Sequence, residues 1–132
     1  DKPYALFIGL NPSTADETLD DPTIRRCIDF AKRWGYGGLV MANLFAYRAT
    51  DPREMKAATD PVGVANDEWL IELAQYAGVV VAAWGNHGAF LRRSSHIRAL
   101  LSELHYLQLN QSGEPTHPLY LNSTLTPLRW AI

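Results

Sequence analysis

Three short, wholly apolar runs divide the first two thirds of the chain, and each is followed by a glycine, an asparagine or an aromatic residue. The runs cover residues 4–8, 39–42 and 79–83. An uninterrupted apolar run of this length is typical of a strand that is covered on both faces of its sheet. We therefore expect three buried strands, and helices that cover both faces of the sheet they form.

The segments between the runs carry helix-start signals. Asp21-Pro22 places a capping side chain before a proline, and the apolar spacing after it predicts a helix over residues 22–34. Asp60-Pro61 repeats this pattern and predicts a second helix that extends to Gly78. Residues 46–60 are expected to form a loop with one short helical turn.

The last third of the chain predicts one more helix and one more strand. Residues 106–109 form a plausible fourth strand, and the chain from Asn110 onward is expected to be mostly loop. Alternating strands and helices imply right-handed crossovers, so residues 1–132 are expected to form one α/β domain. We predict a three-layer sandwich with a short, mostly parallel four-stranded sheet. The third helix would carry four apolar side chains on one face: Ile97, Leu100, Leu101 and Leu104.

Charge and composition exclude several classes of protein. The net charge of −2 argues against a protein that holds duplex nucleic acid mainly by neutralising phosphates. Two basic clusters lie in predicted helices, and a solvated helix face explains each of them most simply. The clusters are Arg25, Arg26, Lys32 and Arg33, and Arg92, Arg93 and Arg98.

The single cysteine, Cys27, is expected to be a core residue, because it lies on the apolar stripe of its helix. One cysteine cannot form an internal disulfide, no apolar run is long enough to span a membrane, and no secretory signal opens the chain. These features predict a cytoplasmic protein with no membrane partner.

The polar residues that follow the apolar runs predict where a ligand binds. In parallel α/β folds, ligands bind outside the carboxyl ends of the strands. We expect three segments to meet there. They are Gly9 to Ser13, Asn43 to Phe45, and Trp84 to His87, which includes Asn86.

The first of these segments, Gly9-Leu10-Asn11-Pro12-Ser13, lacks the glycine pattern of a dinucleotide site and the lysine of a phosphate-binding loop. Pro12 fixes the backbone just after Asn11 and would display that carboxamide in a rigid turn, where it could hold a water or the edge of a heterocycle. A simple polar turn is the alternative.

Asn43 ends an apolar strand, where a carboxamide is costly unless the backbone or a ligand satisfies it. Its paired donor and acceptor suit the hydrogen-bonding edge of a nucleobase. Phe45 and Tyr47 alternate beside it and could stack on that base, although aromatic residues at a strand end are more often core residues.

His117 differs from the other histidines because it precedes Pro118 in a loop after the last predicted strand. Its ring is a candidate for catalysis or binding. The remaining histidines are expected to be structural or at the surface, and none has metal-ligand spacing to another. Capping and solvation explain the acidic residues near the first helix, so we expect no metal and no cofactor. These residues are Asp16, Glu17, Asp20 and Asp21.

Taken in order, the motifs resemble those of the uracil-DNA glycosylase superfamily. Its members place a Gly-x-Asp/Asn-Pro turn after the first strand, a strand that ends in asparagine, an apolar strand that ends in Trp-Gly, and a late His-Pro loop. Here the matching segments are 9–12, 39–43, 79–87 and 117–118. The resemblance implies that Asn11 orients the hydrolytic water, Asn43 reads the base and His117 stabilises the departing base.

A second resemblance covers the whole chain. The segments Leu10 to Asp16, Trp84 to Gly88 and His117 to Tyr120 look like those of a family of uncharacterised bacterial and phage proteins. That family brings no established activity.

The expected function is therefore a glycosylase-like hydrolase that acts on a nucleobase N-glycosidic bond. The chain departs from the uracil enzymes after Pro118, where Leu-Tyr-Leu replaces the Ser-Pro loop that pinches the DNA backbone. Single-stranded DNA or a free nucleoside is therefore the expected partner, since a flipped duplex base needs many phosphate contacts. The alternatives are a silent module that binds a nucleobase or nucleic acid, and an enzyme of unrelated chemistry on the same scaffold.

Overall fold

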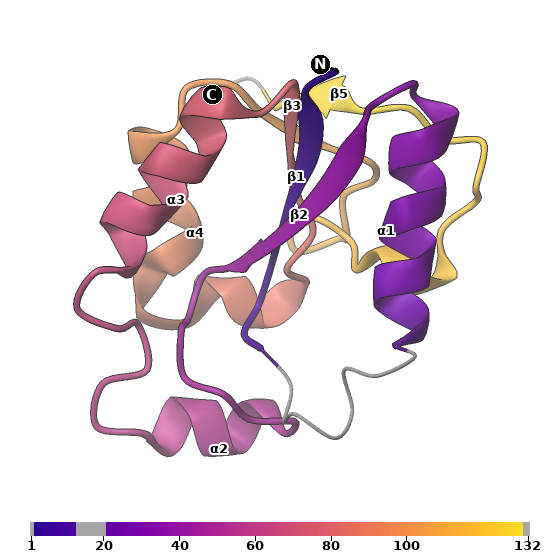
Figure 1. Ribbon diagram of the computed structural model, residues 1–132. Coiled ribbons are helices and arrows are strands. Elements are labelled where there is room, and N and C mark those ends of the chain that lie inside the picture. The colour runs from indigo at the N-terminus through magenta and orange to yellow at the C-terminus, as the bar shows by residue number, and fades with distance from the viewer. Residues whose placement is uncertain (1, 13–20, 131–132) are drawn as a thin grey trace.

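The computed structural model describes residues 2–12 and 21–130, which fold around a five-stranded mixed sheet (Figure 1). The strand order is β2-β1-β3-β4-β5. The pairings β1–β2, β1–β3 and β3–β4 are parallel, whereas β4–β5 is antiparallel. The strands are β1 (Tyr4–Gly9), β2 (Gly38–Asn43), β3 (Val79–Ala82), β4 (Leu104–Tyr106) and β5 (Leu128–Arg129).

The first three strands confirm the sequence prediction, but the last part of the sheet corrects it. Leu104, which was assigned to the third helix, begins β4, so the predicted strand at 106–109 lies two residues too late. β5 was not predicted at all, because its two exposed residues form no apolar run. The sheet therefore has five strands rather than four.

Two of the expected caps are present. Asp21 accepts a hydrogen bond of 2.7 Å from the backbone N–H of Thr23 at the start of α1 (Pro22–Arg33). Asp51 does the same for Arg53 at 2.9 Å, at the start of α2 (Pro52–Ala57), which is the short helical turn expected in the 46–60 loop. Both helices thus begin where an aspartate and a proline meet in the sequence.

The helix expected after Asp60-Pro61 starts later than predicted. Asp60 does not cap a helix but closes a turn, accepting 3.1 Å from the N–H of Gly63, and α3 covers Asn66–Tyr76. The Asn86–Arg92 segment forms a 3-10 helix, interrupted at Phe90 and Leu91, before α4 (Arg93–Leu100). None of the described helices is long and apolar enough to cross a membrane.

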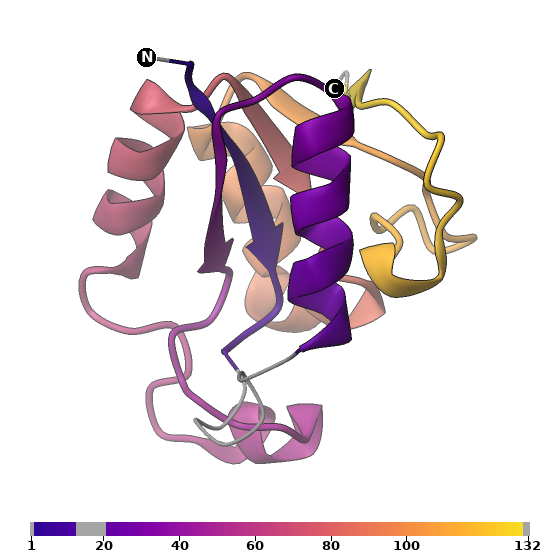
Figure 2. The ribbon, with the colours of Figure 1, turned by 45° about the vertical axis from the view of Figure 1, so that its right-hand side comes forward.

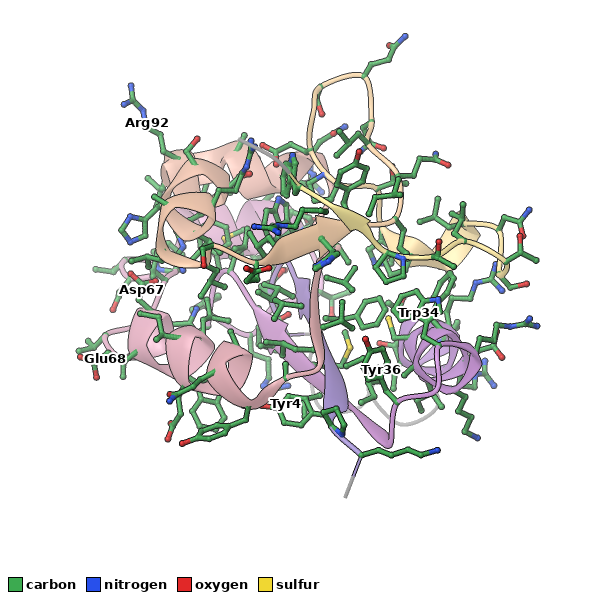
Figure 3. The ribbon with its side chains drawn as sticks, turned by 90° about the horizontal axis from the view of Figure 1, so that it is seen from above. Tyr4, Trp34, Tyr36, Asp67, Glu68 and Arg92 are labelled. Carbon is green, nitrogen blue, oxygen red and sulfur yellow. The ribbon has the colours of Figure 1, made fainter. Side chains whose placement is uncertain are left out.

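Helices cover both faces of the sheet, as predicted. Alternate residues of β1 face opposite layers: Phe7 packs against Phe30 of α1, whereas Ile8 packs in the cluster with Leu70 of α3 and Ile97 of α4. Figure 2 shows α1 on one side of the strands and α3 and α4 on the other. Figure 3, seen from above, shows Trp34 on the α1 side of the sheet and Asp67 on the α3 side.

Two buried-residue predictions have different outcomes. Cys27 is fully buried in the α1 layer, and burial, helped by the nearby Asp21, raises the pKa of its thiol to about 12. This confirms its core role. β2, in contrast, is an edge strand rather than a strand covered on both faces. Only Ala42 of its six residues is buried, because no strand of the described chain pairs with its outer edge.

The strand register places the carboxyl ends of three strands side by side. Gly9 lies opposite Asn43, and Ile8 lies opposite Ala82, the last residue of β3. The carboxyl ends of β1, β2 and β3 therefore meet at the lower end of the sheet in Figure 1, next to α2.

Candidate functional site

A pocket of about 460 Å³ opens at the carboxyl ends of the three parallel strands. All three strand-end segments and the His117-Pro118 loop contribute to it, so residues far apart in the sequence meet at one cavity, as predicted. The predicted residues that line it are Gly9, Asn11, Pro12, Asn43, Trp84, Asn86, His87, His117 and Pro118. Other residues were not predicted, among them Asp21, Thr23, Ile24, Met41, Thr50 and Ala83.

Backbone pairing continues beyond the strands and builds one wall of the pocket. The carbonyl of Gly9 accepts a hydrogen bond of 2.9 Å from Leu44, and that of Leu10 accepts 2.9 Å from Phe45. Further along, the carbonyl of Pro12 accepts 2.9 Å from Ala49. Backbone hydrogen bonds therefore join the described parts of the two loops after β1 and β2.

The Asn11 carboxamide is anchored by its nitrogen. Nδ2 donates to the carbonyls of Ala49 at 2.7 Å and Tyr47 at 3.1 Å, and it lies 3.3 Å from the carbonyl of its neighbour Pro12. Three carbonyls around one end of the amide identify that end as the nitrogen. No described residue donates a hydrogen bond to Oδ1, so Asn11 offers the pocket an acceptor in a fixed position.

Asn43 presents an amide without a partner among the described residues. It is half-buried and lines the pocket, yet neither its Oδ1 nor its Nδ2 forms a hydrogen bond there. Gly9 makes room for it, because a Cβ at that position would lie 3.2 Å from Asn43 Oδ1. The amide can therefore offer a donor and an acceptor to a ligand.

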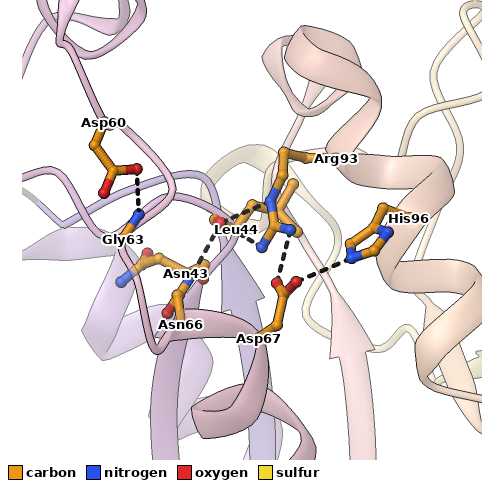
Figure 4. A network of polar contacts seen from close by, with 8 residues as sticks. All are labelled: Asn43, Leu44, Asp60, Gly63, Asn66, Asp67, Arg93 and His96. Atoms are coloured by element: carbon orange, nitrogen blue, oxygen red, sulfur yellow. Dashed lines mark hydrogen bonds and ion pairs between the residues drawn. The ribbon is translucent and has the colours of Figure 1, made fainter.

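A buried arginine holds the backbone next to Asn43 (Figure 4). Arg93 is 4% exposed, and its Nε and Nη2 donate to the carbonyl of Leu44 at 3.0 and 2.8 Å. Its Nη1 forms an ion pair of 2.7 Å with Asp67. Arg93 was expected on a solvated helix face, and this is wrong: the residue turns inward from the start of α4 to bind a strand-end carbonyl.

Two further side chains complete this network. Asn66 Nδ2 donates at 2.9 Å to the carbonyls of both Asn43 and Leu44. His96 Nε2 lies 2.9 Å from Asp67. Partial burial raises the pKa of Asp67, but the contacts with Arg93 and His96 outweigh burial and lower it below its usual value. Asp67 therefore stays ionised and neutralises Arg93.

His117 lies at the rim of the pocket with a defined ring orientation. Its Nδ1 accepts a hydrogen bond of 3.3 Å from the backbone N–H of Leu119 and so caps the one-turn helix Pro118–Tyr120. Desolvation lowers the pKa of His117, although Asp21 opposes this in part. At neutral pH the ring is therefore uncharged, with its proton on Nε2, which becomes a hydrogen-bond donor.

Trp84 forms a rigid part of the pocket wall. Its indole is 2% exposed, donates to Glu114 at 2.9 Å and packs against Trp130. Gly88 is needed for this position, since a Cβ there would lie 2.0 Å from Trp84 Cδ1. The sequence motif Trp-Gly-Asn-His-Gly thus includes one glycine that the tryptophan itself requires.

Asn86 and His87 lie in the same stretch but differ in their freedom to bind. Asn86 Oδ1 accepts hydrogen bonds from Asn110 at 2.9 Å and from Ser112 at 2.6 Å, which holds the 110–114 loop. His87 is exposed and lines the pocket. Asn86 is therefore mainly a structural residue at the pocket edge.

Two predicted site residues are not in the pocket wall that the structure describes. Phe45 is fully buried and packs against Phe90 and the guanidinium of Arg93, so its predicted stacking on a ligand is wrong. It is core because Leu44 and Phe45 continue the apolar strand beyond Asn43. Ser13 lies outside the described residues. Within them, no group of three or more histidine, cysteine or acidic side chains is arranged to hold a metal ion.

Comparisons with known proteins identify a family but no activity. A family model described as "Protein of unknown function (DUF1643)" matches residues 1–119. Neither the curated proteins nor the solved structures gave a match.

Proposed function

We propose that this chain, which belongs to the DUF1643 family, is a glycosylase-like hydrolase that cleaves a nucleobase N-glycosidic bond. One observation carries the proposal. Asn11, Asn43 and His117 line a single pocket, and each keeps a polar group available to a ligand there. The order of these residues around the sheet also supports a fold related to the uracil-DNA glycosylases.

The base would be read by Asn43 and receive a hydrogen bond from His117. Cleavage leaves negative charge on the base, so donors placed in advance at the base lower the barrier. A neutral histidine with its proton on Nε2 is such a donor, and the lowered pKa of His117 keeps it neutral at pH 7. The amide of Asn43, which has no partner among the described residues, supplies the complementary donor and acceptor.

The attacking water would be held by Asn11. Its Nδ2 is fixed by loop carbonyls, so Oδ1 can accept a hydrogen bond from water in a set direction. An amide is a much weaker base than a carboxylate, and it positions the water rather than removing its proton. Since the sugar becomes an oxocarbenium-like cation, positioning can suffice, with slow turnover as the consequence.

The apolar part of the pocket suits the flat face of a heterocycle. Ile24, Met41 and Ala83 contribute to it, and no metal or organic cofactor is needed for this chemistry. The single buried cysteine, Cys27, is compatible with the reducing cytoplasm predicted from the sequence.

A catalytically inactive binding module is the second candidate, and one observation favours it. The Asn11 nitrogen makes three contacts with loop carbonyls, which is a structural role that needs no catalysis. A nucleobase could then bind to Asn43 and His117 without being cleaved.

Base release decides between the two. We would incubate the protein with single- and double-stranded DNA that contains uracil, hypoxanthine or alkylated bases, and with free nucleosides. The wild type is compared with His117→Ala and Asn43→Ala, and with His105→Ala as a control outside the pocket. Release that both pocket variants lose and His105→Ala keeps supports the hydrolase. Binding that depends on Asn43, without release, supports the module, and neither binding nor release refutes both.

A further inference from the structure

The pocket at the strand ends has a carboxylate in its wall and no basic side chain of the lysine or arginine type. Asp21 lines it beside the start of α1, and no lysine or arginine lines it within the described residues. The residues outside the described ranges contain no lysine or arginine either, so they cannot add one. A ligand in the pocket thus meets a negative charge that no lysine or arginine of the wall accompanies.

The carboxylate is held in place by the helix that it caps. Asp21 is half-buried, and its Oδ1 accepts a hydrogen bond of 2.7 Å from the backbone N–H of Thr23. No donor among the described residues binds Oδ2. The N-terminus of a helix carries roughly half a positive charge, which is less than the full negative charge of the carboxylate. The capped end of α1 therefore presents net negative charge to the pocket.

Asp21 lies on the same side of the pocket as His117. Figure 2 shows the start of α1 beside the one-turn helix Pro118–Tyr120, which directly follows His117 in the chain. Desolvation lowers the pKa of His117, and the negative charge of Asp21 opposes this in part. Since His117 is the proposed donor to the base, the carboxylate acts on the part of the pocket where that base would lie.

A neutral base and a cationic base would respond differently to this carboxylate. A neutral base such as uracil becomes an anion when it leaves with the electron pair of the glycosidic bond, and Asp21 would repel it. An N-alkylated base already carries a positive charge, which Asp21 attracts and which the uncharged ring of His117 does not repel. A cationic base is also the better leaving group, and this suits a site whose water is held by an amide rather than by a carboxylate.

We propose that the pocket selects a nucleobase that carries a positive charge through N-alkylation, and that Asp21 is the residue that sets this preference. The inference rests on the proposed hydrolysis of an N-glycosidic bond. The oxygen of a water bonds to the sugar C1′ while the C1′–N bond breaks, and the electron pair of that bond cancels the positive charge of the base. The water loses a proton to the solvent, so the products are a neutral base, a sugar hemiacetal and a proton.

The test measures selectivity with a matched pair of nucleosides. 7-Methylguanosine and guanosine differ by a methyl group and a positive charge, in a buffer slightly below neutrality that keeps the methylated ring cationic. Calorimetry measures binding, and chromatography measures base release. Single-stranded DNA that contains 7-methylguanine or uracil is tested in parallel, because a strand and a nucleoside are two sources of the same cationic base.

Two variants test the role of the carboxylate. Asp21→Asn removes the charge but keeps the helix cap, because asparagine caps a helix about as well as aspartate. Asp29→Asn is the control, since it makes the identical change on the same helix about 12 Å further along its axis. Asp29 does not line the pocket and pairs with Arg33 at 2.9 Å. Thermal unfolding checks that both variants are folded.

We expect the wild type to bind 7-methylguanosine at least about tenfold more tightly than guanosine, which is the scale of one charge interaction in a partly screened site. Asp21→Asn should reduce that ratio to about threefold or less. Asp29→Asn should keep it within about twofold of the wild type, because an exposed charge at that distance is largely screened. Base release should follow the same order, with 7-methylguanine released in preference to uracil.

Three results would overturn the inference: equal affinities of the wild type for the two nucleosides, an unchanged ratio in Asp21→Asn, or equal losses in both variants. The first of these needs no variant. The two proposals fail separately. Faster release of uracil than of 7-methylguanine removes only the charge preference, whereas Asp21-dependent binding of the cation with no base release from any substrate removes only the hydrolase.

Discussion

Asn43, at the end of β2, and Asn66, which binds that strand end from α3, show how differently this fold uses the same side chain. Asn66, the first residue of α3, donates through Nδ2 to the carbonyls of Asn43 and Leu44. Asn43, whose backbone carbonyl accepts one of those bonds, lines the pocket, and its side-chain amide has no hydrogen-bond partner among the described residues. On the α3 side of the strand end, Asn66 and Arg93 hold the backbone, whereas the Asn43 amide that lines the pocket has no partner among the described residues.

The network next to Asn43 explains how its amide can be held in place without a partner among the residues that the structure describes. Arg93 and Asn66 together occupy the Leu44 carbonyl, and the backbone of Leu44 is also tied to Gly9. Burying a guanidinium costs solvation free energy, which its bonds to Leu44 and Asp67 offset. These bonds hold the backbone of Leu44 and so position its neighbour Asn43, which we propose reads the base.

Replacing the buried arginine should destabilise the protein more than any other change considered below. Arg93→Met should lower the free energy of unfolding by about 3 kcal/mol, because it leaves the Leu44 carbonyl and Asp67 without their main partner. Arg92→Met is the matched control. Arg92 is exposed and points away from the network (Figure 3), so we expect a change within about 0.5 kcal/mol. Urea denaturation measures both, and similar losses would contradict the structural role of Arg93.

A methyl group at Gly88 should be the next most harmful change. Gly88→Ala would place its Cβ 2.0 Å from the Trp84 ring, and forcing the indole aside is expected to cost about 1 to 3 kcal/mol. Gly38→Ala serves as the control, since no atom lies within 4 Å of the Cβ it adds. Thermal unfolding, followed by tryptophan fluorescence, would test the difference. A Gly88→Ala protein as stable as Gly38→Ala would mean that Trp84 is not fixed.

Replacing each of the two asparagines in turn compares their contributions to stability directly. Asn66→Ala should cost about 1 to 2 kcal/mol, because two strand-end carbonyls lose a donor. Asn43→Ala should stay within about 0.5 kcal/mol, because its amide has no described partner to lose. Chemical denaturation of the two variants is the measurement. A larger loss for Asn43→Ala than for Asn66→Ala would show that the pocket amide is structural.

The smallest expected effect is on the pH dependence of stability. The pKa of His117 is lowered in the folded chain, so below its usual value of about 6.5 the unfolded chain binds a proton that the folded chain resists. Stability should therefore fall as the pH drops through that value, and less so in His117→Gln. Melting curves from pH 7.5 to about 5 compare the two proteins. Equal pH dependence would show that the ring is as hydrated as in the unfolded chain.

Much of the fold could be predicted because local signals and final structure agree. The apolar runs that became β1, β2 and β3, and the Asp-Pro starts of α1 and α2, depend on residues next to one another in sequence. The failures have local causes too. Asp60-Pro61 carries the same signal but closes a turn, and β5 is too short and exposed to be recognised.

The sequence by itself determined that polar residues would gather at the strand ends, because parallel strands place their carboxyl ends at one edge of a sheet. It did not determine which of those residues face the cavity. Asn43 and Phe45 are separated by one position, yet one lines the pocket and the other is fully buried.

Only the tertiary structure decided that Arg93 is internal and that Arg26 binds the carbonyl of Leu121. A run of basic residues in a helix is usually solvated, and its local sequence contains no sign of an ion pair with α3 or of a loop from residue 117 onward packing beside it. Such contacts depend on how distant elements pack. Local periodicity therefore predicts the layers of this protein, whereas the partners of its charged side chains depend on how those layers pack against one another.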